Sequence, residues 1–284
     1  MSAGTVVYLH GMGGVRPDWA APLRIDGVST IAPHYADLLD PDRAVYATRS
    51  EATMPLESSS EERARYVERQ RDLADAIQRA GEAVPRGTSW PAGLPHPARL
   101  PDRLPLPQVL RTPLFGVDQV GRYLDDAGRR AAVIARVRDA LRGARPPVVV
   151  LAHSLGSVVM ADMLSELPCD VELLVTLGSP LGHEAVASAV PLGPFPYGRM
   201  GGWANVVHLL DPVPFGRGLA DRIPAAFDVY LPVLAGAPSA LGTIPWLMGG
   251  IVRAATAHLD TTYLASDSVR AAVRYGLGRH AEVR

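Results

Sequence analysis

Short runs of β-branched and aliphatic residues alternate along the chain with amphipathic stretches, and this alternation predicts strands that alternate with helices. Continuous apolar runs bounded by turn residues are typical of parallel strands that are buried on both faces. Such runs occupy residues 5–9, 28–32, 148–152, 171–177, 205–210 and 227–231. The pattern therefore predicts an α/β fold with a mostly parallel sheet of about six strands and helices on both faces.

The amphipathic stretches predict where the helices lie. Residues 58–80 begin with Ser59 three positions before Glu62, which is the spacing of a capping box. Their apolar stripe is expected to consist of Val67, Leu73, Ile77 and Ala80. Further helices are expected at residues 18–23, 117–142, 155–167 and 264–275.

Two stretches do not follow this alternation. Residues 40–116 include a proline-rich segment that is too broken for a regular element, and residues 229–252 carry no charge. We expect both to lie over the carboxyl edge of the sheet, within a single domain of residues 1–284, the first as a cap and the second as an apolar lid. The uncharged segment is long enough to span a bilayer, but its prolines and glycines favour a lid, with membrane contact as the alternative.

Composition limits the classes of function. Of the 284 residues, 48% are hydrophobic and 20% are charged, which suffices for one compact core. The formal net charge of −1 gives no electrostatic reason to expect nucleic acid as a partner. Cys169 is the single cysteine, which excludes an internal disulfide, and the N-terminal residues lack a secretory pattern, so a cytoplasmic location is expected.

The stretch 148–160, VVVLAHSLGSVVM, places a serine between an apolar strand and an apolar helix. A sharp strand-to-helix turn exposes such a hydroxyl above the carboxyl edge of a parallel sheet, where α/β proteins bind ligands. The turn requires small residues two positions before and after the serine, and Ala152 and Gly156 meet this requirement around Ser154. The pattern predicts a nucleophile elbow, with a simple helix N-cap as the alternative role of Ser154.

Together with HGMGG after the first strand, AHSLG resembles the motifs of serine hydrolases of the α/β-hydrolase superfamily, close to the lipases and esterases. The resemblance covers residues 5–263 and is interrupted by 40–116. It implies an oxyanion hole formed by the backbone N–H groups of Met12 and Leu155. Members of this superfamily usually have two more strands before the oxyanion loop, so a reduced sheet is expected here.

The resemblance also implies a catalytic acid at a later strand end and a catalytic histidine after it. Asp211 follows the apolar run 205–210, and His258 lies in a loop before the last expected helix. With Ser154 as the nucleophile, these two residues are the expected acid and base.

Other residues of the same types fit each role less well. His280 also follows the expected acid but lies in a polar tail. Asp170 begins a strand, Asp228 lies within one, and Asp260 is two residues from the expected base. Ser179 lies in GSPLG, where a proline follows it in place of a helix start, so it is expected to shape the pocket wall.

These residue types support acyl transfer through a covalent acyl-enzyme. The expected function is hydrolysis of the carboxylic ester of an apolar small-molecule acyl substrate, without a metal or nucleotide cofactor. An acyltransferase or thioesterase-type enzyme with the same triad is the alternative, and a non-catalytic binding protein is a third possibility. The acyl pocket is expected to be lined by Leu234, Leu241, Ile244, Trp246 and Leu247.

Overall fold

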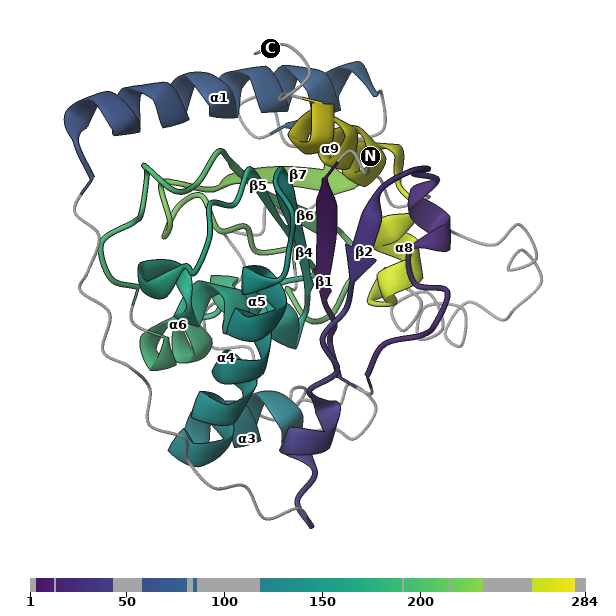
Figure 1. Ribbon diagram of the computed structural model, residues 1–284, viewed down its shortest axis with the longest axis vertical. Helices are drawn as coiled ribbons and strands as arrows, with labels where there is room; N and C mark the ends of the chain where they lie inside the picture. The colour runs from purple at the N-terminus through teal and green to yellow at the C-terminus, as the bar shows by residue number, and fades with distance from the viewer. Residues whose placement is uncertain are drawn as a thin grey trace.

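The computed structural model describes residues 4–12, 14–42, 58–80, 84–85, 118–190, 192–214, 216–231 and 257–278. Within these ranges the chain forms a seven-stranded sheet of order β2-β1-β4-β5-β6-β7-β3 (Figure 1). The strands are β1 Thr5–Leu9, β2 Ser29–Ile31, β3 Val84–Pro85, β4 Val148–His153, β5 Leu173–Leu177, β6 Trp203–His208 and β7 Phe227–Leu231.

Six of these described strands are parallel, and the two-residue β3 pairs antiparallel with β7 at the edge of the sheet. The predicted α/β class with a mostly parallel sheet is therefore confirmed. Because parallel strands end at the same edge, the residues that follow β4, β5 and β6 lie close together in space.

Helices cover both faces of the sheet (Figure 1). Their bounds are α1 Ser60–Arg79, α3 Asp118–Asp125, α4 Ala127–Arg142, α5 Leu155–Asp162, α6 Glu184–Ala189, α8 Asp260–Leu264 and α9 Asp267–Gly278. Alternate residues of β4 enter the two layers: Val149 and Leu151 pack in the core with α1 and α9, and Val148 and Val150 in the core with α4 and α5.

Helix α1 lies in the stretch that was expected to form a cap, but it belongs to a layer of the fold. It runs beside α9, and Leu73 and Ile77 are fully buried in the core that it shares with the sheet. The predicted capping box of Ser59 and Glu62 is present. Tyr66 is buried on this helix, whereas Val67, expected on the buried stripe, is 41% exposed.

The bounds of the remaining predicted helices need correction, and two of these helices are each divided in two. The stretch 117–142 forms two helices because Asp126 interrupts it and caps α4 by accepting a hydrogen bond from the N–H of Arg129. The stretch 18–23 is helical only as a single 3-10 turn at Ala21–Leu23. The last predicted helix is divided between α8 and α9, since Ser266 accepts a hydrogen bond from the Val269 N–H at the start of α9.

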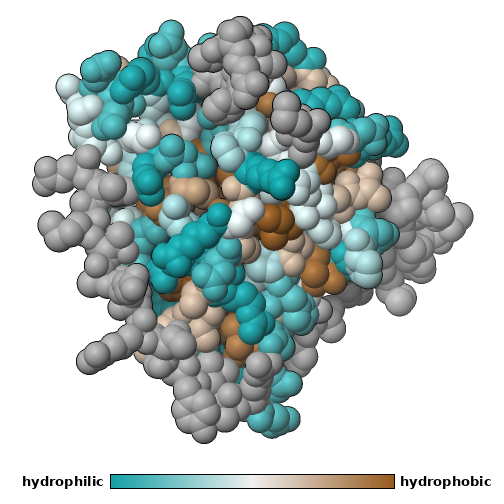
Figure 2. Space-filling view, viewed as in Figure 1, coloured by the Kyte–Doolittle hydropathy of each residue, from teal (hydrophilic) through white to brown (hydrophobic). Residues whose placement is uncertain are grey.

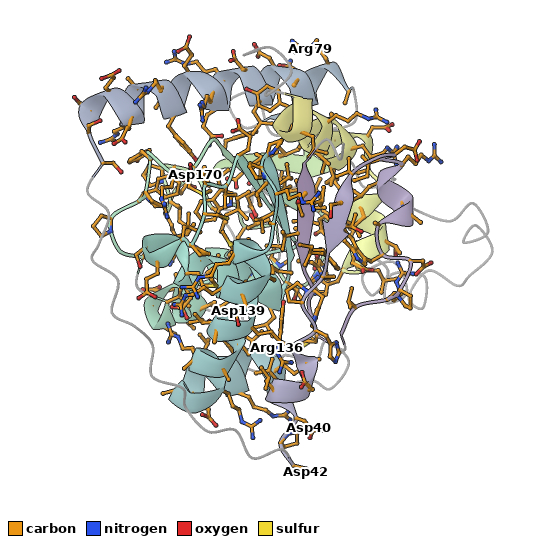
Figure 3. The ribbon with its side chains drawn as sticks, viewed as in Figure 1. Asp40, Asp42, Arg79, Arg136, Asp139 and Asp170 are labelled. Carbon is orange, nitrogen blue, oxygen red and sulfur yellow. The ribbon has the colours of Figure 1, made fainter. Side chains whose placement is uncertain are left out.

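Polar contacts attach the loops to these layers. Arg136 of α4, labelled in Figure 3, donates to Asp37 at 2.7 Å and to the carbonyl oxygen of His34 at 2.6 Å. These bonds hold the loop after β2 against the helices of that face. The loop carries Tyr35, which contacts the residues that follow β1.

On the face shown in Figure 2, described apolar side chains are scattered among polar ones and do not form one large patch. No helix within the described ranges is both long and apolar enough to cross a membrane. Nearly all of the 229–252 segment lies outside the described residues, as does most of 40–116 apart from α1. The lid and the rest of the cap therefore stay predictions.

Candidate active site

The turn between β4 and α5 consists of a single residue, Ser154. Its backbone has φ 51° and ψ −117°, a conformation that non-glycine residues rarely adopt and that is typical of a strained nucleophile elbow. The Ser154 N–H donates to the carbonyl oxygen of Leu177 on β5 at 2.9 Å, which ties the turn to the neighbouring strand. The Ser154 side chain makes no capping bond to α5, so the N-cap alternative is wrong.

Two glycines allow the backbone to approach closely around this turn. A Cβ on Gly156 would lie 2.2 Å from the carbonyl oxygen of Leu9, so α5 reaches β1 only because this residue has no side chain. A Cβ on Gly11 would lie 2.9 Å from His153 Nδ1 and 3.1 Å from Ser154 Cβ. The loop after β1 therefore lies directly against the serine.

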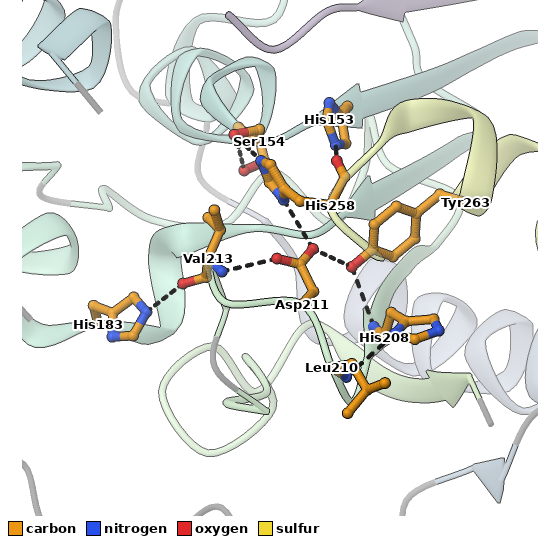
Figure 4. Close-up of polar contacts among 10 residues, drawn as sticks. His153, Ser154, His183, His208, Leu210, Asp211, Val213, His258 and Tyr263 are labelled. Carbon is orange, nitrogen blue, oxygen red and sulfur yellow. Dashed lines mark hydrogen bonds and ion pairs between the residues drawn. The ribbon is translucent and has the colours of Figure 1, made fainter. Parts of the chain in front are cut away.

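The three predicted site residues meet at the carboxyl edge of the sheet (Figure 4). His258 Nε2 lies 3.1 Å from Ser154 Oγ, and His258 Nδ1 lies 2.8 Å from Asp211 Oδ2. The Asp211 side chain has no exposed surface, and the His258 side chain is 13% exposed. Residues that are far apart in the sequence thus form a continuous hydrogen-bonded series from hydroxyl to carboxylate.

The carboxylate of Asp211 is held by two further donors. Its Oδ1 accepts the N–H of Val213 at 2.8 Å, and its Oδ2 accepts the hydroxyl of Tyr263 at 2.6 Å. Burial, and then the charge of Asp211, raise the pKa of the Tyr263 hydroxyl well above its usual value, so Tyr263 is a neutral donor. Tyr263 was not among the predicted site residues, because a tyrosine in an apolar helix is usually a core residue and its sequence gives no specific signal.

Gly178, at the end of β5, leaves the space in which these groups meet. Its φ is +55°, and a Cβ there would lie 2.7 Å from Asp211 Oδ2, 3.1 Å from the Tyr263 hydroxyl and 3.2 Å from His258 Nδ1. Any side chain at this position would push the three groups apart. The sequence identified GSPLG as a turn in the pocket wall but gave no reason for this glycine.

His153 holds the loop that carries His258. Its Nε2 lies 2.9 Å from the carbonyl oxygen of His258, and the two rings are 4.8 Å apart. Because a carbonyl oxygen only accepts, Nε2 carries the proton. Burial lowers the pKa of His153 well below its usual value, so this ring stays neutral and holds the backbone of His258 in place.

Contacts of His10 and Tyr35 fix the loop expected to supply an oxyanion donor. The ring of His10 stacks on Tyr35 at 4.0 Å, its Nδ1 donates to the carbonyl oxygen of Gly11 at 2.6 Å, and its Nε2 accepts the Tyr35 N–H at 3.4 Å. The N–H of Met12 belongs to the same planar peptide as that carbonyl, so its direction is fixed as well. The N–H of Leu155 is in the first turn of α5, where a helix offers it no internal acceptor.

The rival nucleophile Ser179 is not placed like Ser154. Ser179 is buried and its hydroxyl contacts Ser157 at 2.7 Å and the N–H of Leu181 at 3.3 Å, so it caps the short turn that follows β5. His280 lies outside the described residues. Leu234, Leu241, Ile244, Trp246 and Leu247, the expected pocket lining, also lie outside them and stay predictions.

The rival acids have other partners. Asp228 is buried in β7 and accepts hydrogen bonds from the N–H groups of residues 219–220. Asp260 accepts the hydroxyl of Tyr8 at 3.1 Å, and the side chain of Asp170 is 79% exposed. In the part of the chain that the structure describes, no cluster of three or more histidine, cysteine or acidic side chains could hold a metal ion.

Comparison of the chain with protein-family models, with curated proteins and with solved structures gave no match. The hydrogen-bonded arrangement around Ser154 is therefore the basis on which a function can be proposed.

The buried histidines predict a specific dependence of stability on pH. Burial lowers the pKa of His10 from 6.5 to about 4, so below pH 6.5 the unfolded chain binds a proton that the folded chain does not. The free energy of unfolding should therefore fall between about pH 6.5 and 4, by up to about 1.4 kcal/mol per pH unit for this one group. Urea denaturation at several pH values measures it. A His10→Gln variant should show a shallower fall, and an equal slope would contradict the assignment.

Proposed function

We propose that the protein is a serine hydrolase of the α/β-hydrolase type that cleaves the carboxylic ester of an apolar acyl substrate. The observation that carries the proposal is the series of hydrogen bonds from Ser154 Oγ through His258 to buried Asp211, with the serine on a turn of positive φ. A hydroxyl with a purely structural role does not need a strained backbone, a histidine placed to accept its proton and a buried carboxylate bonded to that histidine.

Each residue has a defined part in the proposed reaction. His258 Nε2 takes the hydroxyl proton as Ser154 Oγ attacks the acyl carbon, while Nδ1–H stays bonded to Asp211. The tetrahedral intermediate collapses to an acyl-enzyme, and the leaving alkoxide takes the proton from His258. A water molecule then gives a proton to the same nitrogen and attacks the acyl carbon. When this second tetrahedral intermediate collapses, Ser154 Oγ leaves as it takes the proton back from His258, and the carboxylic acid is released.

The oxyanion that forms in each step needs fixed donors. The proposed donors are the N–H groups of Met12, whose peptide is held by the His10 contact with Gly11, and of Leu155, the first residue of α5 after Ser154. Loss of one such donor costs roughly 3 kcal/mol of transition-state stabilisation in known cases. Both are backbone groups, so the donors themselves are insensitive to side-chain substitution.

A fluorophosphonate tests the proposal, since it phosphonylates only a serine that has an adjacent base and oxyanion donors. We expect stoichiometric labelling, mapped by peptide mass spectrometry to Ser154, and hydrolysis of p-nitrophenyl butyrate in preference to the acetate. Ser179→Ala is the matched control and should label like the wild type. Labelling at Ser179, or none, would remove the proposal.

A further inference from the structure

We propose that Tyr263 is a positioning residue that sets the base strength of His258 through its hydrogen bond to Asp211. The inference rests on the proposed function, because it takes Asp211 and His258 as the acid and base of the reaction. It adds a fourth side chain to the three expected from the sequence.

Tyr263 and His258 donate to the same carboxylate oxygen. Asp211 Oδ2 accepts the Tyr263 hydroxyl at 2.6 Å and His258 Nδ1 at 2.8 Å, while Oδ1 is bonded to the N–H of Val213 (Figure 4). The hydrogen bond from the tyrosine therefore weakens the one from the histidine, because both are accepted by the same oxygen.

The direction of the tyrosine bond follows from its other contact. The hydroxyl oxygen of Tyr263 accepts the N–H of His208 at 3.1 Å, so its own proton is left to point at Asp211. Tyr263 is fully buried, so water does not compete for that proton. Gly178 faces the same atoms and leaves no free volume there for a mobile side chain.

This bond affects the reaction in two ways. It keeps the carboxylate of Asp211 in the plane that His258 requires, because Val213 holds one oxygen and Tyr263 the other. It also withdraws negative charge from Oδ2, which weakens the attraction between the carboxylate and protonated His258. With the tyrosine bond present, the free base forms at a lower pH than it would without it.

The side chains of the other titratable groups near the pair have partners other than the Tyr263 hydroxyl. His153 on β4 is neutral and bonded to the carbonyl oxygen of His258, and Asp260 on α8 is bonded to Tyr8 of β1. Two further groups lie after β1: His10, whose pKa is lowered, and Arg16, which faces Asp260. The ring of His208 accepts the N–H of Leu210, and the ring of His183 contacts the carbonyl oxygen of Val213. Removal of the Tyr263 hydroxyl takes one acceptor from the backbone N–H of His208 but leaves each of these side-chain contacts in place.

The test is the pH dependence of kcat/KM for a p-nitrophenyl ester in Tyr263→Phe. We expect its acid limb to move to higher pH by about half a unit or more, and its plateau to fall by about tenfold. Tyr66→Phe is the matched control, because Tyr66 is equally buried and donates one 2.6 Å bond, to the carbonyl oxygen of Ala225 on the loop before β7. Its pH profile should match the wild type.

Two further measurements keep the test decisive. Site-specific 3-fluorotyrosine at position 263 keeps the shape and strengthens the donor, so the acid limb should move to lower pH even if the phenylalanine variant folds poorly. In a Ser154→Ala background, the NMR titration of the His258 ring should shift in the same directions, with the signal assigned through His258→Gln. This readout needs no turnover, so it separates failure of the inference from failure of the proposed function.

A lower plateau with an unmoved acid limb in Tyr263→Phe would mean a purely structural tyrosine and would overturn the inference. An unmoved His258 titration would overturn it equally. If no ester is hydrolysed but the titration shifts as expected, Tyr263 tunes His258 and the ester-hydrolase proposal is the part that fails.

Discussion

Replacement of Ser154 by alanine should lower the kcat for p-nitrophenyl butyrate by about a millionfold. The reason is that Ser154 Oγ is the one oxygen in contact with His258 Nε2, at 3.1 Å, in the described part of the chain. Without this hydroxyl, only a water molecule can act as the nucleophile. The remaining groups, His258, Asp211 and the oxyanion donors, then give a small rate above that of the uncatalysed reaction. Steady-state kinetics and fluorophosphonate labelling measure the loss.

Ser157→Ala is the control for this substitution. Ser157 is buried in α5, three residues after Ser154, and its hydroxyl donates to the carbonyl oxygen of Ser154 at 2.5 Å, yet this hydroxyl has no contact with His258 among the described residues. We expect Ser157→Ala to retain labelling. If Ser154→Ala kept even a hundredth of the wild-type rate, the nucleophile would have to be another residue.

The elbow was predictable from the sequence because its requirements are local. Small residues at positions 152 and 156 and the change from strand to helix are all visible in thirteen consecutive letters. Asp211 and His258 were predictable from their order and from strand-end placement, since parallel strands end at one edge. The structure brings the three together as expected.

Gly178 and Tyr263, which position the three predicted site residues, were not predictable from a local pattern. Gly178 matters because three groups, from the loop after β6, from α8 and from the loop before α8, converge on the place where its Cβ would be. Tyr263 matters because its hydroxyl reaches Asp211, 52 positions away in the sequence. Both facts arise from packing in three dimensions, and neither residue has a local pattern that distinguishes it from an ordinary turn glycine or core tyrosine.

The position of α1 illustrates the same limit. Its capping box was predicted correctly from the Ser59–Glu62 spacing, and Leu73 and Ile77 were predicted correctly from a period of 3.6, but periodicity does not say what the apolar face contacts. Leu73 and Ile77 pack on the sheet beside α9, so this helix is a layer of the fold. The exposed Val67 and buried Tyr66 show that the predicted stripe is wrong at its start, where Tyr66 takes the buried position on the same face as Leu73 and Ile77.

Asp211 is a buried carboxylate whose described partners are hydrogen-bond donors, and no arginine is among them. Its described partners are the N–H of Val213, the hydroxyl of Tyr263 and His258 itself. A buried carboxylate normally loses several kcal/mol of solvation unless hydrogen bonds replace the water. Three donors on two oxygens satisfy that need and leave the carboxylate in one orientation.

Asp211→Asn should therefore lower kcat by about a thousandfold to ten-thousandfold with little change in fold. The N–H of Val213 requires an oxygen at the Oδ1 position, so the new amide NH₂ has to take the place of Oδ2. There it donates to His258 Nδ1 and leaves the proton of the ring on Nε2. A protonated Nε2 donates to Ser154 Oγ and has no lone pair to accept its proton.

Kinetics with a p-nitrophenyl ester and circular dichroism measure this prediction, with Asp260→Asn as the control. Asp260 is two positions from His258 but bonds Tyr8, so its amide should keep activity within a few-fold of the wild type. Because the defect is a wrong tautomer rather than a lost base, activity of Asp211→Asn should rise at high pH, where hydroxide takes up the Ser154 proton without the histidine. A folded Asp211→Asn protein with more than a tenth of wild-type activity would move the catalytic acid to another residue.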